Sequence, residues 1–360
     1  MIDDPRSSVT KPRSGAAVLY LIILAAVTGC NDEPTGRDVA PQTLGGALVA
    51  VVGPSEGHPQ WPGIRGGVQH FLAGAPSLRA YCAAPADERP ESLKATVVRV
   101  LERRPAIVCL YVVDAETVRP TIDLFSARQT ILLTTGEPCS YRRIAGHVDV
   151  DVAGAAELLG TNLAQLAAGR QSYLLLHDGG RNAQATNCYQ RFSAAVQRRY
   201  EMTLLRAAST AQSQRTAAQL VEEMLEQFPH AGLFVTLTPD VWLTARAGWN
   251  QRLRALNPTF RFATISAAPI LWRRLGTPGA PGEAAALVGP LDGDIGYALL
   301  KMATQFLLSS ERPATAVTIP CEVVTPETLP DFAARYSVAA NGLDVSEFLP
   351  APTSNASPPE

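Results

Sequence analysis

Residues 47–61 read Ala-Leu-Val-Ala-Val-Val-Gly-Pro-Ser-Glu-Gly-His-Pro-Gln-Trp. The apolar first half is typical of a parallel strand that is covered on both faces, and the second half is typical of a loop that leads into a helix. Ligands of open parallel sheets bind beyond the carboxyl ends of the strands. We therefore expect His58, Gln60 and Trp61 to contact a ligand, although packing at the rim of a cleft would equally explain Trp61.

Strand and helix patterns alternate downstream of this stretch. Further strands are expected at residues 77–83, 106–113, 130–135, 147–151, 172–177, 202–207, 232–237, 260–265, 284–289 and 315–325. Helices are expected between them, the clearest at residues 90–104, 216–228 and 294–308, where apolar residues recur at helical spacing. Such an alternation requires parallel sheets built from right-handed crossovers. The sequence therefore predicts an α/β fold of two doubly wound parallel-sheet lobes, joined by a hinge, whose strands end at one cleft.

The N-terminal residues are typical of a secretory signal. Three basic residues precede an apolar run at residues 16–27, which is shorter than the ~20 residues that a membrane-spanning helix needs. The run ends in Val-Thr-Gly-Cys, which resembles the lipobox of bacterial lipoproteins, where lipid is attached to the cysteine. We therefore expect a signal peptide at residues 1–29, a lipid-anchored linker at residues 30–46, and a lipid on Cys30 that holds the protein to a membrane in the periplasm or at the cell surface. The alternatives are an uncleaved anchor and an ordinary signal peptide with a chance cysteine.

Bulk features argue against several classes of partner and cofactor. A net charge of -2 gives no basic footprint for nucleic acid. There is no Cys-x-x-Cys pair and no His-x-x-x-His spacing, so we expect no metal site. There is also no Gly-x-Gly-x-x-Gly or phosphate-loop motif, and we expect no cofactor. Five cysteines besides Cys30 make an odd number, so at least one thiol should remain unpaired in an oxidising compartment.

Residues 53–57, Gly-Pro-Ser-Glu-Gly, match the Gly-x-Ser-x-Gly motif of serine hydrolases and follow a predicted strand. A hydrolase with Ser55 as nucleophile also needs an oxyanion donor from an earlier strand loop and a histidine to complete the triad. Here the folded chain has only just begun, and the last histidine, His230, precedes its strand. We therefore expect a protein that is not an enzyme, with an exported serine hydrolase as the less favoured alternative.

Histidine and acidic residues near other predicted element ends are further candidates. His177 and Asp178 end one strand, where ligand contact and solvation of a loop are both reasonable. Asp292 and Asp294 lie at the start of a helix and invite a glycosidase interpretation, but capping of the helix and interaction with its dipole explain them better.

Three short motifs resemble those of the type I periplasmic sugar-binding proteins, which share their fold with the ligand domains of lactose-repressor-like regulators. The motifs are His-Pro-Gln-Trp at residues 58–61, Gly-His-Val-Asp-Val-Asp at 146–151, and Asp-Ile-Gly at 294–296. The resemblance in order and spacing covers residues 47–325. It implies a lipid-anchored solute-binding protein that closes two lobes over a sugar or another small polar ligand. Its implied partner is the permease of an ABC transporter or a sensor protein.

The resemblance also implies the lobe boundaries. The first lobe is expected at residues 47–151 and is completed by about 291–316, and the second is expected at 152–290 and is completed by about 317–338. Residues 339–360 are rich in Pro, Ser and Ala, and we expect a disordered tail there.

Members of this family bind their ligands through side chains that follow the strands. By resemblance we expect ligand contacts from His58, Gln60, Trp61, Thr135, Glu137, Asp178, Asn182, Thr238, Asp240, Ser266 and Asp292. Several charged residues of the family pattern are replaced here. Thr135-Gly136 occupies the position of the family's Asp-Arg pair, and Ser266 occupies the position of an aspartate. The arginine expected in the helix after Asn182 is not evident. Sugar hydroxyls need fixed, charge-assisted hydrogen-bond partners, and these replacements remove several of them. The alternative that the ligand is not a monosaccharide but a peptide, a quorum-type signal or a protein partner therefore stays open.

Overall fold

The structure is a computed structural model that describes residues 46–125, 128–166, 171–198, 202–237, 261–277, 280–281, 284–309 and 314–350. These residues all belong to one compact unit, residues 40–360. Cys30, Thr238 and Asp240 lie outside the described residues, as do the predicted signal peptide and most of the predicted linker.

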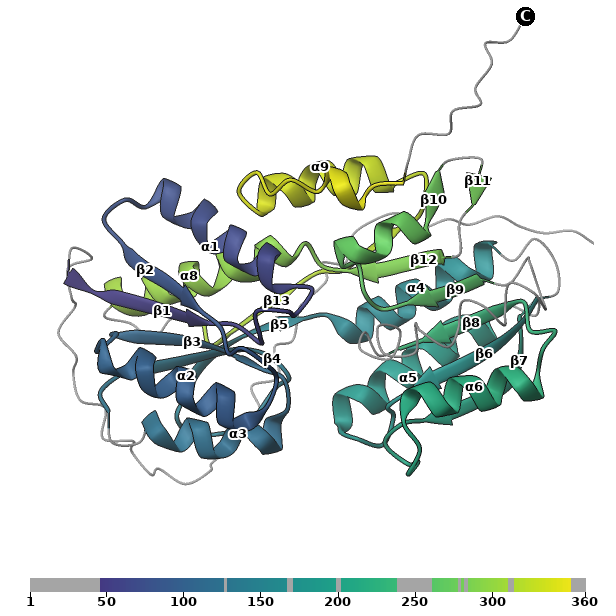
Figure 1. Ribbon diagram of the computed structural model, residues 1–360, viewed down its shortest axis with the longest axis horizontal. Helices are drawn as coiled ribbons and strands as arrows, with labels where there is room; N and C mark the ends of the chain where they lie inside the picture. The colour runs from purple at the N-terminus through teal and green to yellow at the C-terminus, as the bar shows by residue number, and fades with distance from the viewer. Residues whose placement is uncertain are drawn as a thin grey trace, which may run out of the picture. The chain divides into compact units, whose positions relative to one another are not determined.

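The first sheet carries its strands in the order β13-β5-β4-β3-β1-β2, and every neighbouring pair is parallel (Figure 1). Its strands are β1 (Leu48–Val52), β2 (Arg79–Ala83), β3 (Ile107–Val112), β4 (Ile131–Gly136), β5 (Ile144–Val150) and β13 (Ala316–Ile319). The helices on it are α1 (Trp61–Gly74), α2 (Pro90–Glu102), α3 (Ala115–Ile122), the one-turn η2 (Asp123–Phe125) and α8 (Asp292–Leu308). Because α1 and α8 cover one face and α2 and α3 the other, strands β1 and β3 are buried on both faces and almost entirely apolar.

The second sheet has the order β14-β12-β9-β8-β6-β7 and is parallel except for β14, which runs antiparallel to β12 (Figure 1). Its strands are β6 (Gln171–His177), β7 (Met202–Ser209), β8 (Leu233–Thr236), β9 (Arg261–Thr264), β12 (Ala284–Gly289) and β14 (Glu322–Val324). One face packs against α4 (Val152–Leu166) and α5 (Ala183–Gln197). The other packs against α6 (Ala217–Gln227), η3 (Pro269–Arg274) and α9 (Leu329–Ala339). The small elements are β10 (Gly276–Thr277), β11 (Ala280–Pro281) and η4 (Ser346–Phe348).

The predicted α/β class with two parallel-sheet lobes is confirmed, and the chain passes between the sheets after β5, after β12 and after β13. The last crossing differs from the expected one. Residues 317–319 pair with β5 and so belong to the first lobe, whereas we expected the second lobe to resume at about 317. The reason is that Val317 and Ile319 face the apolar core beneath α8, and Pro320, which lacks an N–H group, follows the strand.

The C-terminal region is more ordered than its composition suggests. α9 was not anticipated, and the predicted disordered tail at 339–360 is wrong for residues 339–350, which the structure describes. Val345 and Phe348 pack against the core of the second lobe, so this segment continues the fold. Asn341, at φ 57, and Gly342, at φ 77, reverse the chain after α9, and the left-handed conformation is one that these residue types tolerate best.

Glycines allow α1, α8 and α9 to approach one another closely. An added Cβ at Gly67 of α1 would overlap the carbonyl oxygen of Gly293 in α8, and one at Gly66 would overlap the backbone of Ala340 at the end of α9. α9 also places Phe332 in the core of the second lobe. This helix therefore contacts elements of both lobes.

Candidate functional site at the carboxyl ends of the two sheets

The predicted binding residues that the structure describes follow the strands of both sheets. His58 and Gln60 lie in the loop between β1 and α1, Glu137 follows β4, and Asn182 and Ser266 follow β6 and β9. This position is the one at which α/β sheets bind ligands. The structure brings some of these residues together in two polar clusters, one between the lobes and one at the start of α8.

The first cluster joins the lobes. Asn182 donates from Nδ2 to Oε1 of Glu137 over 2.7 Å. Arg181 donates from one guanidinium nitrogen to Oε2 of Glu137 at 3.1 Å and to Oδ2 of Asp114 at 2.8 Å. Two side chains of the second lobe thus hold two carboxylates of the first.

Asp114 and Asn182 are also helix caps, which fixes their side chains. Asp114 accepts from the backbone N–H groups of Glu116 and Thr117 at the start of α3, and Asn182 accepts from that of Ala185 at the start of α5. Partial burial would raise the pKa of Asp114, but the hydrogen bonds from Thr117 and Arg181 outweigh it, so the pKa is lowered. Asp114 is therefore ionised at neutral pH and attracts the guanidinium.

Sequence reasoning missed Arg181. An arginine was expected within the helix after Asn182, whereas this one precedes the helix. It follows a tight turn in which Gly180 has a φ of 101° and the N–H of Arg181 donates to the carbonyl oxygen of Asp178. The Asp-Gly-Gly-Arg-Asn sequence at residues 178–182 signals such a turn, but not the direction in which its arginine points.

The second cluster is centred on Asp292, which is 2% exposed. Its Oδ1 accepts from Nε2 of Gln60 at 3.0 Å, and its Oδ2 accepts from the hydroxyl of Tyr336 in α9 at 2.7 Å. Oε1 of Gln60 in turn accepts from the hydroxyl of Tyr111 in β3 at 2.9 Å. Burial raises the pKa of Asp292 to about 7, and the hydrogen bonds from Tyr336 and Gln60 only partly offset it.

Trp61 is the first residue of α1 and lies in the core. Its side chain is 2% exposed, and its ring packs on Gly53, where an added Cβ would overlap the ring. Its indole Nε1 is buried without a hydrogen-bond partner. Packing accounts for this aromatic residue, and the ring has no accessible face for a sugar; a direct ligand contact stays a prediction.

Thr135 lies near the carboxyl end of β4, directly beside Tyr111 of β3 in the register of the sheet. It is 1% exposed, and its Oγ1 has no hydrogen-bond partner. The neighbouring Thr134 points to the opposite face and bonds Nδ1 of His147 at 2.9 Å. Thr135 therefore holds an unsatisfied polar atom near the predicted ligand edge.

The second lobe contributes a fixed histidine at the end of β6. The ring of His177 stacks on Tyr189 with centroids 4.2 Å apart, and its Nδ1 accepts from the N–H of Gly179 at 3.0 Å. Burial lowers the pKa of His177, so its ring is neutral at pH 7. Asp178 and Ser266 are half-buried near this edge.

Other chemistry has little support among the described residues. Ser55 is 4% exposed, which does not suit a nucleophile that must reach a substrate. Within the part of the chain that the structure describes, no group of His, Cys, Asp and Glu is arranged to hold a metal ion, and the cysteines are all unpaired. Nor does any helix in the described ranges have the length and apolar character needed to cross a membrane.

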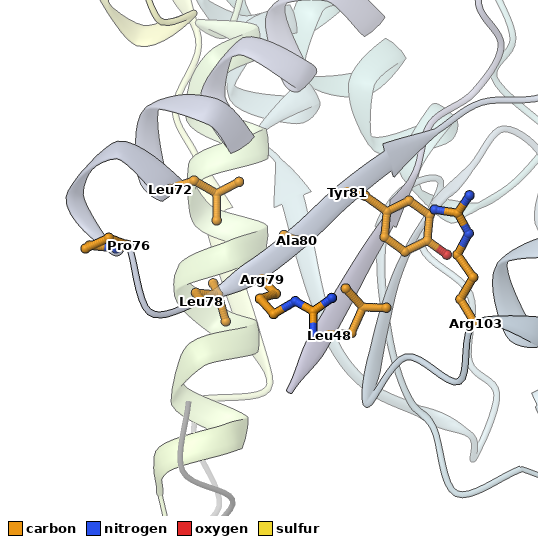
Figure 2. A pocket seen from close by; sticks show the side chains of 8 residues that line it. All are labelled: Leu48, Leu72, Pro76, Leu78, Arg79, Ala80, Tyr81 and Arg103. Atoms are coloured by element: carbon orange, nitrogen blue, oxygen red, sulfur yellow. The ribbon is translucent and has the colours of Figure 1, made fainter. Parts of the chain in front are cut away.

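A shallow cavity of about 720 Å³ lies elsewhere on the first lobe (Figure 2). It is formed at the amino ends of β1 and β2 and at the end of α2, where Leu48, Arg79 and Arg103 line it. Figure 2 shows the Arg103 side chain beside the Tyr81 ring, and its guanidinium carbon is 4.8 Å from the ring centroid. This cavity lies at the opposite end of the strands from the polar clusters.

Solved structures share this arrangement of elements. A glucose-galactose binding protein, GanP, from Geobacillus stearothermophilus has a TM-score of 0.61 at 14% sequence identity, over 79% of this chain and 99% of that chain. An ABC transporter solute-binding protein from Agrobacterium vitis, bound to alpha-D-tagatopyranose, has a TM-score of 0.64 at 13% identity, and the match covers 85% of this chain and 100% of that chain. An ABC transporter solute-binding protein from Actinobacillus succinogenes, bound to D-allose, has a TM-score of 0.65 at 11% identity, and the match covers 79% of this chain and 99% of that chain.

The fold is that of the type I periplasmic binding proteins. At these identities the likeness establishes the fold alone. No family model and no curated protein sequence matches the chain.

In the periplasmic binding fold, two lobes close on a hinge around a ligand. In this chain, Arg181 and Asn182 of the second lobe bond Glu137 of the first lobe, and Gln60 bonds Asp292 within the first lobe. Contacts of this kind join positions far apart in the chain, which is why the sequence indicated candidate residues but not their pairing.

Proposed function

We propose that the chain is an extracytoplasmic solute-binding protein that closes its two lobes over a sugar or another small polar ligand. The observation that carries this proposal is the meeting of polar side chains from both sheets at their carboxyl ends, where Arg181 and Asn182 bond Glu137. Contacts of this kind suit the closed state of a two-lobed binding protein.

The proposed ligand contacts remain those named from the sequence, with unequal support. They are His58, Gln60, Trp61, Thr135, Glu137, Asp178, Asn182, Thr238, Asp240, Ser266 and Asp292. Thr135 is supported by its hydroxyl, which has no hydrogen-bond partner that the structure shows; because the residue is 1% exposed, a ligand would reach it only with the lobes open. Trp61 has the weakest support, because its ring is enclosed by the core. Gln60 and Asp292 bond each other, which suits a supporting role behind the surface.

The ligands of the structural neighbours define the first compounds to test. The neighbours include proteins with bound D-allose, D-arabinose, allitol, myo-inositol and alpha-D-tagatopyranose. All are small polyhydroxylated molecules whose hydroxyl groups require fixed hydrogen-bond partners. Carboxylate, amide and hydroxyl side chains at the strand ends of this chain are partners of that kind.

The test is the melting temperature of the mature protein in the presence of each of these compounds. A ligand that binds only the folded protein raises its stability by about 2.7 kcal/mol at a hundredfold excess over Kd. We expect at least one compound to raise the melting temperature of the wild type and to raise it less in Thr135→Val. The control is Thr134→Val, which removes a hydroxyl on the opposite face of the same strand. An equal response of the two variants would count against the proposed site, and no response to any compound would count against a sugar ligand.

The proposed lipid anchor and partner belong to the same account. Lipid on Cys30 would hold the protein to a membrane in the periplasm or at the cell surface, where it would serve the permease of an ABC transporter. Metabolic labelling with a radioactive fatty acid in a bacterial host tests the anchor. The wild type should carry the label and sediment with membranes, and Cys30→Ala should lose the label; equal labelling of both would refute the anchor. A permease and an ATPase encoded beside the gene would support the transport role.

A second candidate is a sensing or partner-binding module on the same fold whose ligand is not a sugar. The observation that favours it is that Arg181, Asn182 and Glu137 satisfy one another across the lobes, which leaves fewer charged partners for sugar hydroxyls. Capture of a peptide, together with no response to the sugar panel, would favour this candidate. The exported hydrolase is less favoured still, and unchanged esterase activity in Ser55→Ala would dismiss it.

A further inference from the structure

The carboxyl group of Asp292 lies where three parts of the fold meet. It begins α8, close after the chain has crossed from β12 of the second lobe. Its two oxygens bond the β1–α1 loop, through Gln60, and α9, through Tyr336. An added Cβ at Gly63 of α1 would lie 2.5 Å from the Tyr336 hydroxyl oxygen and 2.7 Å from the Asp292 Cβ, so the absence of a side chain at Gly63 makes room for this contact.

Gln60 transmits this contact to the predicted ligand edge. Its amide is held on one side by Asp292 and on the other by the Tyr111 hydroxyl. Its backbone N–H donates to Nδ1 of His58 at 3.3 Å, and the rings of His58 and Tyr111 have centroids 5.6 Å apart. We call residues 53–60 the cleft loop. The carboxyl group of Asp292 is thus the buried anchor behind the cleft loop.

We propose that Asp292 is a positioning residue and that its protonation state controls how firmly the cleft loop is held. A protonated carboxyl group can remain buried at little cost, whereas a carboxylate gains from hydration. Of the two side chains bonded to this carboxylate, Gln60 is partly exposed and Tyr336 is buried, so we infer that water reaches it when Gln60 moves away. Ionisation of Asp292 should therefore favour opening of the cleft loop, and protonation should favour the closed arrangement.

The direction of the pH dependence of loop opening follows from the linkage between proton binding at Asp292 and the opening equilibrium. Burial raises the pKa of Asp292 to about 7 from 3.8, and an opened loop returns it toward 3.8. Between these values the closed loop binds more protons than the open one, so the equilibrium constant for opening should rise up to about tenfold per pH unit. Above about pH 7 it should level off.

Other titratable groups near Asp292 do not produce the same dependence. The pKa of Tyr336 is raised well above its usual value, chiefly by burial, so its hydroxyl stays protonated. Burial raises the pKa of Cys321 to about 12. His58 belongs to the cleft loop itself, and its Nδ1 accepts from the N–H of Gln60. Burial also raises the pKa of Asp294 in the same first turn, with Glu322 adding to the effect and Arg335 and His70 opposing it, but the carboxyl group that bonds Gln60 is that of Asp292.

Hydrogen exchange of the cleft loop tests this proposal without any ligand. The informative amides are those of Glu56, His58 and Trp61, which donate to backbone carbonyl oxygens, and that of Gln60. Exchange is measured by mass spectrometry between pH 5 and pH 8 and corrected for the intrinsic pH dependence of exchange. The wild type should show an opening constant that rises at least tenfold between pH 5 and pH 7, and Asp292→Asn should show a flat profile. Asp294→Asn is the matched control and should follow the wild type.

A second variant keeps the test decisive if Asp292→Asn does not fold. Tyr336→Phe removes one hydrogen bond to the carboxylate, which should raise the pKa of Asp292 in the closed state further, so the rise in opening should continue to higher pH before it levels off. A flat wild-type profile, or a slope that persists in Asp292→Asn, would overturn the proposal. The importance of the cleft loop for binding rests on the proposed function, but this readout does not. If no sugar binds, the prediction for hydrogen exchange is unaffected. If the exchange profile is flat, the proposal of sugar binding is unaffected.

Discussion

At the residue scale, two neighbouring buried hydroxyl groups differ in whether they have a hydrogen-bond partner. Thr134 and Thr135 are adjacent in β4 and almost fully buried, yet only Thr134 has a hydrogen-bond partner. A buried hydroxyl without a partner lowers stability, whereas one that is bonded contributes to it. This difference is the reason for our proposal that the Thr135 hydroxyl bonds a ligand when the lobes open, whereas the Thr134 hydroxyl stabilises the fold.

We expect Thr135→Val to raise the free energy of unfolding by about 1 kcal/mol without ligand, because valine removes an unsatisfied polar atom at nearly constant volume. Thr134→Val should lower it by about 1 to 2 kcal/mol, because the bond to His147 is lost. Urea unfolding of both variants measures the difference. The same loss of stability in both would show that the hydroxyl of Thr135 is satisfied.

Asp292 should make stability depend on pH. Because its pKa is raised from 3.8 to about 7, the folded state binds its proton more tightly than the unfolded state does. The free energy of unfolding should therefore fall as pH rises from about 4 to about 7, by at most about 4 kcal/mol, and then level off.

The matched comparison is Asp292→Asn against Asp294→Asn. Asparagine at 292 can still accept from Tyr336, and rotation of the Gln60 amide would let its side chain accept from the new Nδ2. Urea unfolding at pH 5 and pH 8 should therefore show a smaller loss of stability in Asp292→Asn than in Asp294→Asn or the wild type. An equal loss in all three proteins would show that Asp292 does not titrate in this range.

At the element scale, the strands were predictable and the contacts between helices were not. The apolar runs at β1, β3 and β6 identify buried parallel strands because both faces of each sheet are covered. α9 was not predicted, although Leu329, Phe332 and Tyr336 are apolar at helical spacing and the proline near its start suits a first helical turn. The close approach of α1 to α8 and α9 depends on backbone contacts at glycines, which no hydrophobic pattern reports.

Gly67 and Gly74 of α1 test this packing. A methyl group at Gly67 would overlap the backbone of α8, whereas no atom lies within 4 Å of an added Cβ at Gly74. We expect Gly67→Ala to lower the free energy of unfolding by about 3 kcal/mol. Gly74→Ala should leave it unchanged or raise it by about 0.5 to 1 kcal/mol, because alanine favours a helix. Equal effects in thermal unfolding would mean that α1 and α8 are not closely packed.

At the scale of the whole molecule, the side-chain bonds near the strand ends could not be read from the sequence. Asn182 and Glu137, which bond across the lobes, are 45 positions apart, and Gln60 and Asp292, which bond within the first lobe, are 232 apart. The sequence placed each of these residues near a strand end, because strand ends follow from the alternation of elements. Pairing across the lobes depends on how the hinge segments direct the two sheets.

Arg181→Gln should change the arrangement of the lobes more than it changes stability. The Arg181 side chain is 43% exposed, so loss of its ion pairs should cost less than about 1 kcal/mol. Small-angle scattering of the unliganded protein should nevertheless show a larger radius of gyration, because Asp114 loses its partner from the second lobe and Glu137 keeps only Asn182. Arg191→Gln, which breaks an ion pair with Glu157 inside the second lobe, should leave the radius unchanged. The same radius for both variants would mean that Arg181 does not hold the lobes.

The most direct test of a ligand between the lobes is titration calorimetry of the mature protein with the sugars and polyols of its structural neighbours. We predict saturable binding of one molecule per chain for at least one compound. Affinity should be at least tenfold weaker in Thr135→Val and unchanged in Arg79→Gln, at the amino-end cavity. Absence of heat with every compound, or equal loss of affinity in both variants, would contradict a binding site at the carboxyl ends of the two sheets.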